Sequence, residues 1–151
     1  MIQNIGIVGS GQMGAGIAHV AALADRNVVL LDVNEAVLNK ALEAIERNIQ
    51  RQVSRGKLED GAAERALKRI TITTDYSDFN VADLVIEAAT ENEGIKRKIF
   101  ETLVPNLSKE ALIASNTSSI SITRLASTTD RPGKFIGMHF FNPVPIMQLV
   151  E

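Results

Sequence analysis

Short apolar runs alternate along this chain with longer stretches in which apolar residues recur at helical spacing. The short runs predict strands, and they lie at residues 2–8, 27–31, 70–73, 84–87, 112–115 and 135–139. Strands that alternate with helices are typical of a parallel sheet covered by helices on both faces. The pattern therefore predicts an α/β fold with a doubly wound, mostly parallel sheet.

The longest helical stretch lies between the second and third predicted strands. Asn34 can cap it, Gly56 is its natural end, and its apolar positions recur at helical spacing: Val37, Leu38, Ala41, Leu42, Ile45, Ile49 and Val53. A polar turn over residues 58–61 and a short helix to Lys68 follow. Because this stretch is longer than an ordinary crossover, we predict a long helical hairpin insertion over residues 34–68 that projects from the sheet.

Two shorter helices are predicted in the second half of the chain. Asn92 can cap a helix over residues 93–103, which Pro105 closes, and Ser121 can start a helix that ends at Ala126. No internal repeat or low-complexity segment is visible, so the pattern indicates one domain.

The end of the chain is expected to bring an imidazole and a carboxylate together. A proline-containing turn over residues 142–145 follows His139, and residues 147–151 can return as an antiparallel final strand that sets Glu151 opposite His139. A carboxylate beside an imidazole orients the ring and stabilises its protonated form. His139 is therefore a candidate general base for a substrate hydroxyl. A histidine satisfied within the core is the alternative, and the neighbouring turn and Glu151 favour the catalytic interpretation.

A glycine-rich turn follows the first predicted strand and leads into an alanine-rich helical stretch. In Rossmann-type dinucleotide-binding folds, Gly9 would make the tight bend, Gly11 would let the backbone approach a pyrophosphate, and Gly14 would let helix and strand pack closely. The helix N-terminus adds donors and a positive dipole for phosphates. Such glycines also occur in turns that bind nothing, so the context decides. The candidate cofactor-binding residues are Gly9, Ser10, Gly11, Gln12, Met13 and Gly14.

Asp32 supplies that context, because it ends the second predicted strand eighteen residues after Gly14. An acidic side chain at this position can accept hydrogen bonds from the adenosine ribose hydroxyls and repel a 2′-phosphate. No Arg follows it directly, so the sequence favours NAD over NADP. A solvated residue at a strand end is the alternative.

Composition narrows the function classes. With 151 residues and 45% hydrophobic content, the chain can bury a substantial core. A net charge of -2 makes nucleic acid an unexpected partner. No cysteines, two histidines and no His-Glu-x-x-His spacing give a metal site little support. Met1 opens directly onto a predicted strand and no apolar run is long enough to span a bilayer, so we expect a cytoplasmic protein without a membrane partner.

Three further motifs join the glycine turn and Asp32: Glu87-Ala88-Ala89-Thr90-Glu91-Asn92 with Lys96, Ala114-Ser115-Asn116-Thr117-Ser118-Ser119, and Met138-His139-Phe140-Phe141-Asn142-Pro143-Val144-Pro145-Ile146-Met147 through Glu151. With them the chain resembles, over essentially all of its length, the NAD-binding half of L-3-hydroxyacyl-CoA dehydrogenases, and in particular the bacterial 3-hydroxybutyryl-CoA dehydrogenases. The His-Phe-Phe-Asn-Pro block with its downstream Glu is more specific than the glycines. The resemblance implies hydride transfer between C3 of a 3-hydroxyacyl-CoA and NAD.

The resemblance also implies roles for individual residues. His139 would be the general acid/base, Glu151 would orient and stabilise its imidazole, and Ser118 would contact both the substrate oxygen and the cofactor. The nicotinamide-ribose end of NAD would be lined by Glu91, Lys96 and Asn142. Coenzyme A would lie against the helical hairpin, where the matching positions are Asn48 and Arg55, with Arg51 and Lys57 as further candidates for its phosphates.

Members of the family continue into an all-helical C-terminal domain that provides most of the dimer interface. We therefore expect residues 1–151 to be the NAD-binding domain, weakly active or inactive by itself, of an enzyme that forms a homodimer through that further domain. Two other functions are compatible with the motifs. The chain could be a non-catalytic NAD(H)-binding module, or its parent could oxidise a free 3-hydroxy acid, although such enzymes usually place a Lys base in a later helical domain.

Overall fold

The computed structural model describes residues 1–151, and its six strands form one sheet in the order β3-β2-β1-β4-β5-β6. All five strand pairings are parallel. The strands are β1 (Asn4–Val8), β2 (Asn27–Leu31), β3 (Ile70–Thr73), β4 (Leu84–Glu87), β5 (Leu112–Ser115) and β6 (Phe135–Gly137). This order reverses between β1 and β4, which is the arrangement of dinucleotide-binding Rossmann folds. The predicted α/β class and doubly wound sheet are confirmed.

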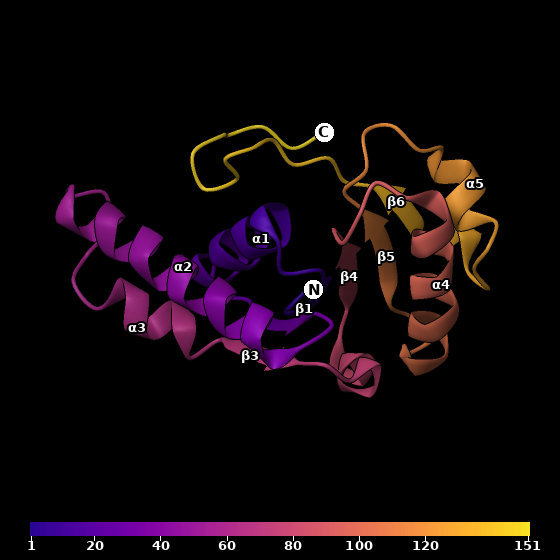
Figure 1. Cartoon of the computed structure of the whole chain (residues 1–151), viewed down its shortest axis with the longest axis horizontal. Coiled ribbons are helices and arrows are strands. Elements are labelled where there is room, and N and C mark those ends of the chain that lie inside the picture. The colour runs from indigo at the N-terminus through magenta and orange to yellow at the C-terminus, as the bar shows by residue number, and fades with distance from the viewer.

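Helices cover both faces of the sheet (Figure 1). They are α1 (Gln12–Leu23), α2 (Glu35–Ser54), α3 (Ala62–Leu67), α4 (Glu93–Leu103) and α5 (Ile122–Ala126), with short 3-10 turns η1 (Tyr76–Val81), η2 (Val104–Asn106) and η3 (Pro132–Lys134). Ile7 belongs to the core under α1 and α2, and its neighbour Val8 belongs to the core under α4. Successive strand side chains point to opposite faces, so a central strand that is apolar at both positions supplies two cores.

The helical hairpin is present where the sequence predicts it. The side chain of Asn34 accepts a hydrogen bond from the backbone N–H of Val37 at 3.0 Å, which caps α2. Its buried stripe consists of Leu38, Ala41, Ile45 and Ile49. In Figure 1, α2 and α3 lie together at the end of the molecule away from α4 and α5.

The sheet register aligns the ends of the strands that carry the candidate site. Val8 of β1 lies between Leu31 of β2 and Glu87 of β4, and Glu87 is paired in turn with Ser115 of β5. These residues end their strands, so the loops that follow β1, β2, β4 and β5 all leave from one edge. Ligands of open α/β sheets bind at this carboxyl edge, next to the point where the strand order reverses.

The predicted antiparallel final strand is wrong. β6 ends at Gly137, before the predicted His139, and it runs parallel to β5. Residues 147–151 form no strand and make one isolated antiparallel bridge, between Phe140 and Val150. The prolines of the intervening turn cannot donate backbone hydrogen bonds, so the returning segment pairs only at its end.

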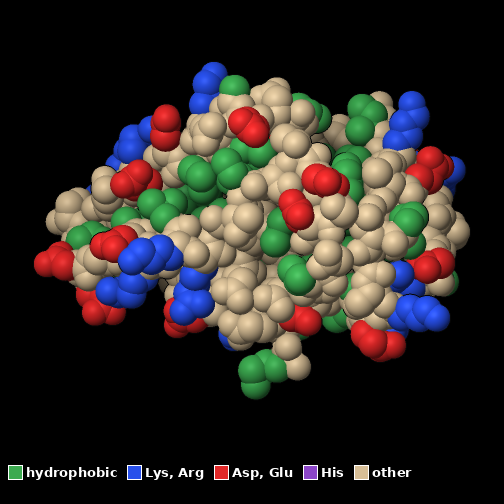
Figure 2. Space-filling model, turned by 90° about the horizontal axis from the view of Figure 1, so that it is seen from below, with side chains coloured by type: hydrophobic (Ala, Val, Ile, Leu, Met, Phe, Trp, Pro, Cys, Tyr) green, Lys and Arg blue, Asp and Glu red, His purple; other side chains and the backbone are tan.

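The surface carries both signs of charge. On the face shown in Figure 2, basic and acidic side chains lie interspersed. No helix of the structure combines the length and apolar character needed to cross a bilayer.

Candidate active site

The glycine turn between β1 and α1 is tightly packed at two positions and open at the third. Gly9 has φ +100°, and a Cβ there would lie 2.6 Å from Cα of Ala89; a Cβ at Gly14 would lie 1.8 Å from the carbonyl oxygen of Gly9. A Cβ at Gly11 would meet nothing within 4 Å. The turn therefore offers free space in front of Gly11 and the N-terminus of α1, where backbone N–H groups can receive a pyrophosphate.

Asp32 is held against this turn. One carboxylate oxygen accepts hydrogen bonds from the backbone N–H and hydroxyl of Ser10 at 2.7 and 2.6 Å, and the other accepts from the N–H of Val33 at 2.7 Å. Partial burial acts to raise the pKa of Asp32, but these hydrogen bonds outweigh it and hold the pKa below its ordinary value. Asp32 is therefore a carboxylate near neutral pH, with lone pairs left for ligand hydroxyls.

A buried polar cluster lies where β4 and β5 end. Glu87 and Lys96 form an ion pair with side chains 0% and 1% exposed. The same oxygen of Glu87 accepts the Ser115 hydroxyl at 2.7 Å, and the other accepts the N–H of Ala89 at 2.9 Å. No role was predicted for Glu87 from the sequence. The available signal was an acidic residue that ends an otherwise apolar strand.

A pocket of about 260 Å³ connects the glycine turn with this cluster. Glu91 stands at its wall, where it accepts hydrogen bonds from the hydroxyls of Thr117 at 2.8 Å and Ser119 at 3.0 Å. The pocket brings together residues from the loops that follow β1, β4 and β5 and from the first turns of α1 and α4: Gly11, Gln12, Met13, Ala88, Ala89, Thr90, Glu91, Lys96, Asn116 and Thr117. Five predicted cofactor-binding residues thus share one cavity: Gly11, Gln12, Met13, Glu91 and Lys96. Ser118 lies beside it on the exposed side of the same loop.

His139 and Glu151 lie side by side. Their backbones exchange two hydrogen bonds, of 2.8 and 2.9 Å, and Nδ1 of the imidazole is 3.6 Å from Oε2 of the carboxylate. The Phe141 ring lies 4.4 Å from the imidazole, centroid to centroid. The next backbone N–H, that of Phe140, donates to Oδ1 of Asn116 at 2.9 Å, which ties this segment to the end of β5. An imidazole 29% exposed beside an acid is suited to exchange a proton with a bound ligand.

A second, smaller pocket of about 160 Å³ lies between α1, α2 and the turn that carries Asn142. Asn142 and Asn48 both line it, together with His19 and Gln12. Nε2 of His19 lies 2.8 Å from Oε1 of Gln52, and burial, only partly offset by this bond, lowers the pKa of His19. Arg55 lies outside this pocket, exposed at the C-terminal end of α2, as do Arg51 and Lys57.

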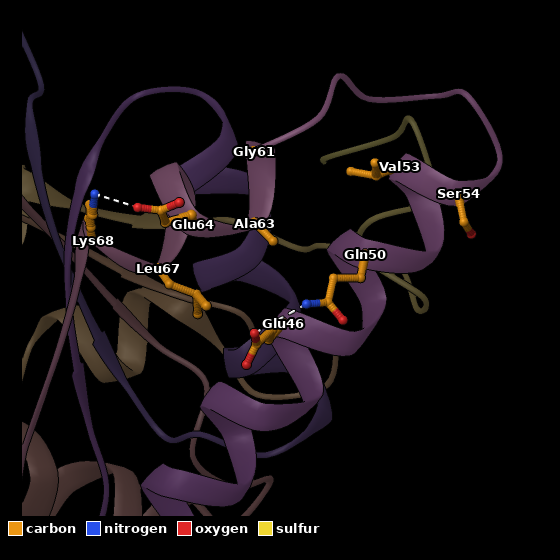
Figure 3. Close-up of a pocket in the computed structure, with 9 residues that line it drawn as sticks. All are labelled: Glu46, Gln50, Val53, Ser54, Gly61, Ala63, Glu64, Leu67 and Lys68. Carbon is orange, nitrogen blue, oxygen red and sulfur yellow. Dashed lines mark hydrogen bonds and ion pairs between the residues drawn. The ribbon is translucent and has the colours of Figure 1, made fainter.

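A larger pocket, of about 630 Å³, lies farther along α2, on its α3 side. It is an open groove between α2 and α3, lined by Glu46, Gln50 and Val53 on one side and by Ala63, Glu64 and Leu67 on the other (Figure 3). Glu46, Gln50 and Val53 occupy a different face of α2 from Asn48. No predicted site residue lines this groove.

Comparison with known proteins identifies the family. Residues 4–151 match the family described as "3-hydroxyacyl-CoA dehydrogenase, NAD binding domain". The chain is 53% identical to 3-hydroxybutyryl-CoA dehydrogenase of Bradyrhizobium diazoefficiens, over 100% of this chain and 52% of that protein. It is 40% identical to mitochondrial hydroxyacyl-coenzyme A dehydrogenase of Rattus norvegicus, over 100% of this chain and 50% of that protein.

Solved structures agree. The crystal structure of (S)-3-hydroxybutyryl-CoA dehydrogenase from Ralstonia eutropha superposes with a TM-score of 0.97 at 46% identity, over 99% of this chain and 53% of that one. The chain thus spans about half the length of the relatives it matches. NAD is the cofactor of the matched domain, and the open space before Gly11 fits its pyrophosphate. The chain belongs to the 3-hydroxyacyl-CoA dehydrogenase family, whose NAD binding domain it matches over residues 4–151.

Proposed function

We propose that the protein is an NAD-dependent L-3-hydroxyacyl-CoA dehydrogenase with 3-hydroxybutyryl-CoA as its substrate. The observation that carries this proposal is the pairing of His139 with Glu151, tied through Asn116 to the wall of the pocket that opens at Gly11. An NAD-binding domain alone has no need of a paired base. The names of the similar proteins support the substrate class.

His139 is the group that moves the proton. In the oxidation, the substrate loses hydrogen from C3 and from its 3-hydroxyl, and NAD, when bound, supplies the acceptor for the hydride. The imidazole takes the hydroxyl proton, and in the reverse reduction it returns that proton to the 3-keto oxygen. Glu151 stabilises the imidazolium that forms. The Nδ1 to Oε2 separation of 3.6 Å is longer than a hydrogen bond, and catalytic pairs of this kind commonly tighten when ligands bind.

The remaining site residues bind and orient. The turn from Gly9 to Gly14 holds the pyrophosphate, and Asp32 binds the adenosine ribose and discriminates against a 2′-phosphate. Lys96 and Glu91 line the cavity proposed for the nicotinamide ribose. Asn142 borders the adjoining pocket, and Ser118 contacts the substrate oxygen and the cofactor.

Coenzyme A is proposed to lie along α2. Asn48 supports this, because it shares a pocket with Asn142 next to the turn after His139. Arg55, with its exposed guanidinium, would contact the phosphates. We further propose that residues 1–151 act as the NAD-binding domain of a cytoplasmic homodimer held by an additional helical domain. Light scattering of the protein in its full natural length measures that oligomeric state.

Steady-state oxidation kinetics test the function. The protein in its full natural length should reduce NAD when given (S)-3-hydroxybutyryl-CoA, and should act poorly with NADP or with free 3-hydroxybutyrate. Absence of turnover with the CoA ester, together with intact NADH binding, would favour a non-catalytic NAD(H)-binding module. Faster turnover of the free acid would redirect the proposal to a 3-hydroxy acid dehydrogenase.

A further inference from the structure

We propose that Gly16 of α1 is a positioning residue for His139 and Glu151. The absence of a side chain at Gly16 lets Val144 pack against α1, and this contact, which we call the seat, fixes the loop between His139 and Glu151. The effects expected on turnover rest on the proposed function, whereas the effects expected on the structure do not. In Figure 1 the C-terminal segment leaves β6, passes over α1 and turns back to the chain end. Val144 and Pro145 of that segment come closest to α1 at Gly16.

The contact at Gly16 is too close for a larger residue. A Cβ built there would lie 2.9 Å from Cβ and 3.1 Å from Cγ2 of Val144, and 3.6 Å from Cδ of Pro145. Val144 must therefore move if Gly16 gains a methyl group. This movement is costly, because the branched side chain of Val144 is packed into the core that includes Ile17.

Gly16 has no backbone reason to be glycine. Its φ lies outside the positive region, and it stands inside a helix, where alanine is the better helix former. The docked Val144 accounts for the absence of a side chain at this position.

Val144 is the buried anchor of an otherwise exposed loop. It is 6% exposed, whereas the apolar residues that follow on the returning arm are exposed to 71% at Ile146, 44% at Met147 and 55% at Leu149. The outgoing arm is held by the bond from Phe140 to Asn116. The returning arm has no comparable burial before it reaches His139.

The position of Glu151 therefore depends on its two backbone hydrogen bonds to His139 and on where the turn is docked. The carboxylate stands at the end of the returning arm, and its Oε2 is 3.6 Å from the imidazole. A shift of the turn at Val144 strains the two backbone hydrogen bonds that join Glu151 to His139, because β6 and Asn116 hold the outgoing arm in place. Small displacements between catalytic groups strongly reduce turnover.

Complementary substitutions in the protein of full natural length test the seat. We expect Gly16→Ala to lower kcat by at least about tenfold, because it pushes the turn outward, and to change the dissociation constant of NADH by less than about twofold. Adding Val144→Gly removes both Cβ and Cγ2, the two atoms that the new methyl group would meet, and should restore kcat to within about threefold of the wild type. Gly133→Ala is the matched control, since a Cβ there meets nothing within 4 Å.

Two further measurements keep the test decisive. Val144→Gly alone removes the side chain that docks on Gly16 and should lower kcat, whereas adding Gly16→Ala fills the space that is left and should improve activity in that background. Imidazole NMR signals of His139, assigned with His139→Gln, should shift in Gly16→Ala and return in the double variant. Wild-type kcat in Gly16→Ala, or no restoration in the double variant, overturns the seat. A wild type that does not oxidise 3-hydroxyacyl-CoA overturns the proposed function, and the NMR shifts then decide the seat alone.

Discussion

Lys96 of α4 and Glu87 of β4 form an ion pair with both side chains withdrawn from solvent, at 1% and 0% exposure. Ser115 and the Ala89 N–H satisfy the remaining lone pairs of the carboxylate. Lys96 also lines the pocket that reaches the glycine turn. The pair thus fixes one ammonium group at the floor of the proposed cofactor site, beside Glu91 and its hydroxyl partners.

Replacing Glu87 by Gln should destabilise the protein strongly. The change leaves the Lys96 charge buried without a counter-charge, and breaking one side of a buried pair costs about 3 to 5 kcal/mol. NADH should also bind more weakly. Glu64→Gln is the matched control, because both side chains of the Lys68–Glu64 pair are exposed and such a pair contributes little to stability. Urea unfolding measures the free energy of unfolding of both variants. Equal losses of stability would contradict the stabilising role of the buried Glu87–Lys96 pair.

The two glycines of the turn should separate folding from binding. Gly14→Ala meets the Gly9 carbonyl at 1.8 Å and should lower the free energy of unfolding by more than about 2 kcal/mol. Gly11→Ala meets nothing and should change it by less than about 1 kcal/mol. Its methyl group occupies the space proposed for the pyrophosphate, so NADH binding should weaken at least about tenfold. Unchanged NADH titration of Gly11→Ala would remove this turn from the cofactor site.

The arrangement of the sheet could be predicted because its signals are local. Four of the six strands have the predicted bounds, and Asn34, Asn92 and Ser121 cap the helices that they were expected to start. Capping and strand formation depend on a few neighbouring residues. The turn η1 was missed, since it is set by the Asp75 cap and by burial of Phe79 beneath the sheet.

The site was less accessible to prediction because its contacts join distant elements. The sequence motifs correctly predicted that Glu91, Lys96 and the glycine turn lie together. The partner of Lys96 could not be predicted, because it depends on how α4 lies over the end of β4. The expected neighbourhood of His139 and Glu151 is confirmed, while the strand expected to create it is absent. Two backbone hydrogen bonds and one isolated bridge replace that strand. The turn between them docks through Val144 on Gly16, a contact between segments more than one hundred residues apart.

His19 should make stability sensitive to mild acid. Burial lowers its pKa in the folded protein, whereas the unfolded chain takes up a proton near the ordinary value of about 6.5. Below that pH the unfolded state binds more protons, so stability present above it is lost as the pH falls toward the folded-state pKa. His19→Gln keeps a hydrogen-bonding group next to Gln52 and removes this proton uptake. Between pH 7.5 and 5.5, urea unfolding should show a loss of up to about 1 kcal/mol that the variant lacks; parallel losses would contradict the expectation.

Substitutions of the paired base and acid should reduce turnover in different degrees without loss of cofactor binding. His139→Gln removes the proton acceptor and should lower kcat by at least about a hundredfold, the usual contribution of general acid–base catalysis. Glu151→Gln keeps the backbone bonds to residue 139 but removes the charge that stabilises the imidazolium, so a smaller loss is expected. Glu46→Gln, in the groove between α2 and α3, is the control and should leave kcat unchanged. Stopped-flow and steady-state kinetics of the full-length protein, paired with NADH fluorescence titration, measure these effects. Full activity in His139→Gln, or a greater loss in Glu46→Gln than in Glu151→Gln, would show that the proton transfer does not take place at His139 and Glu151.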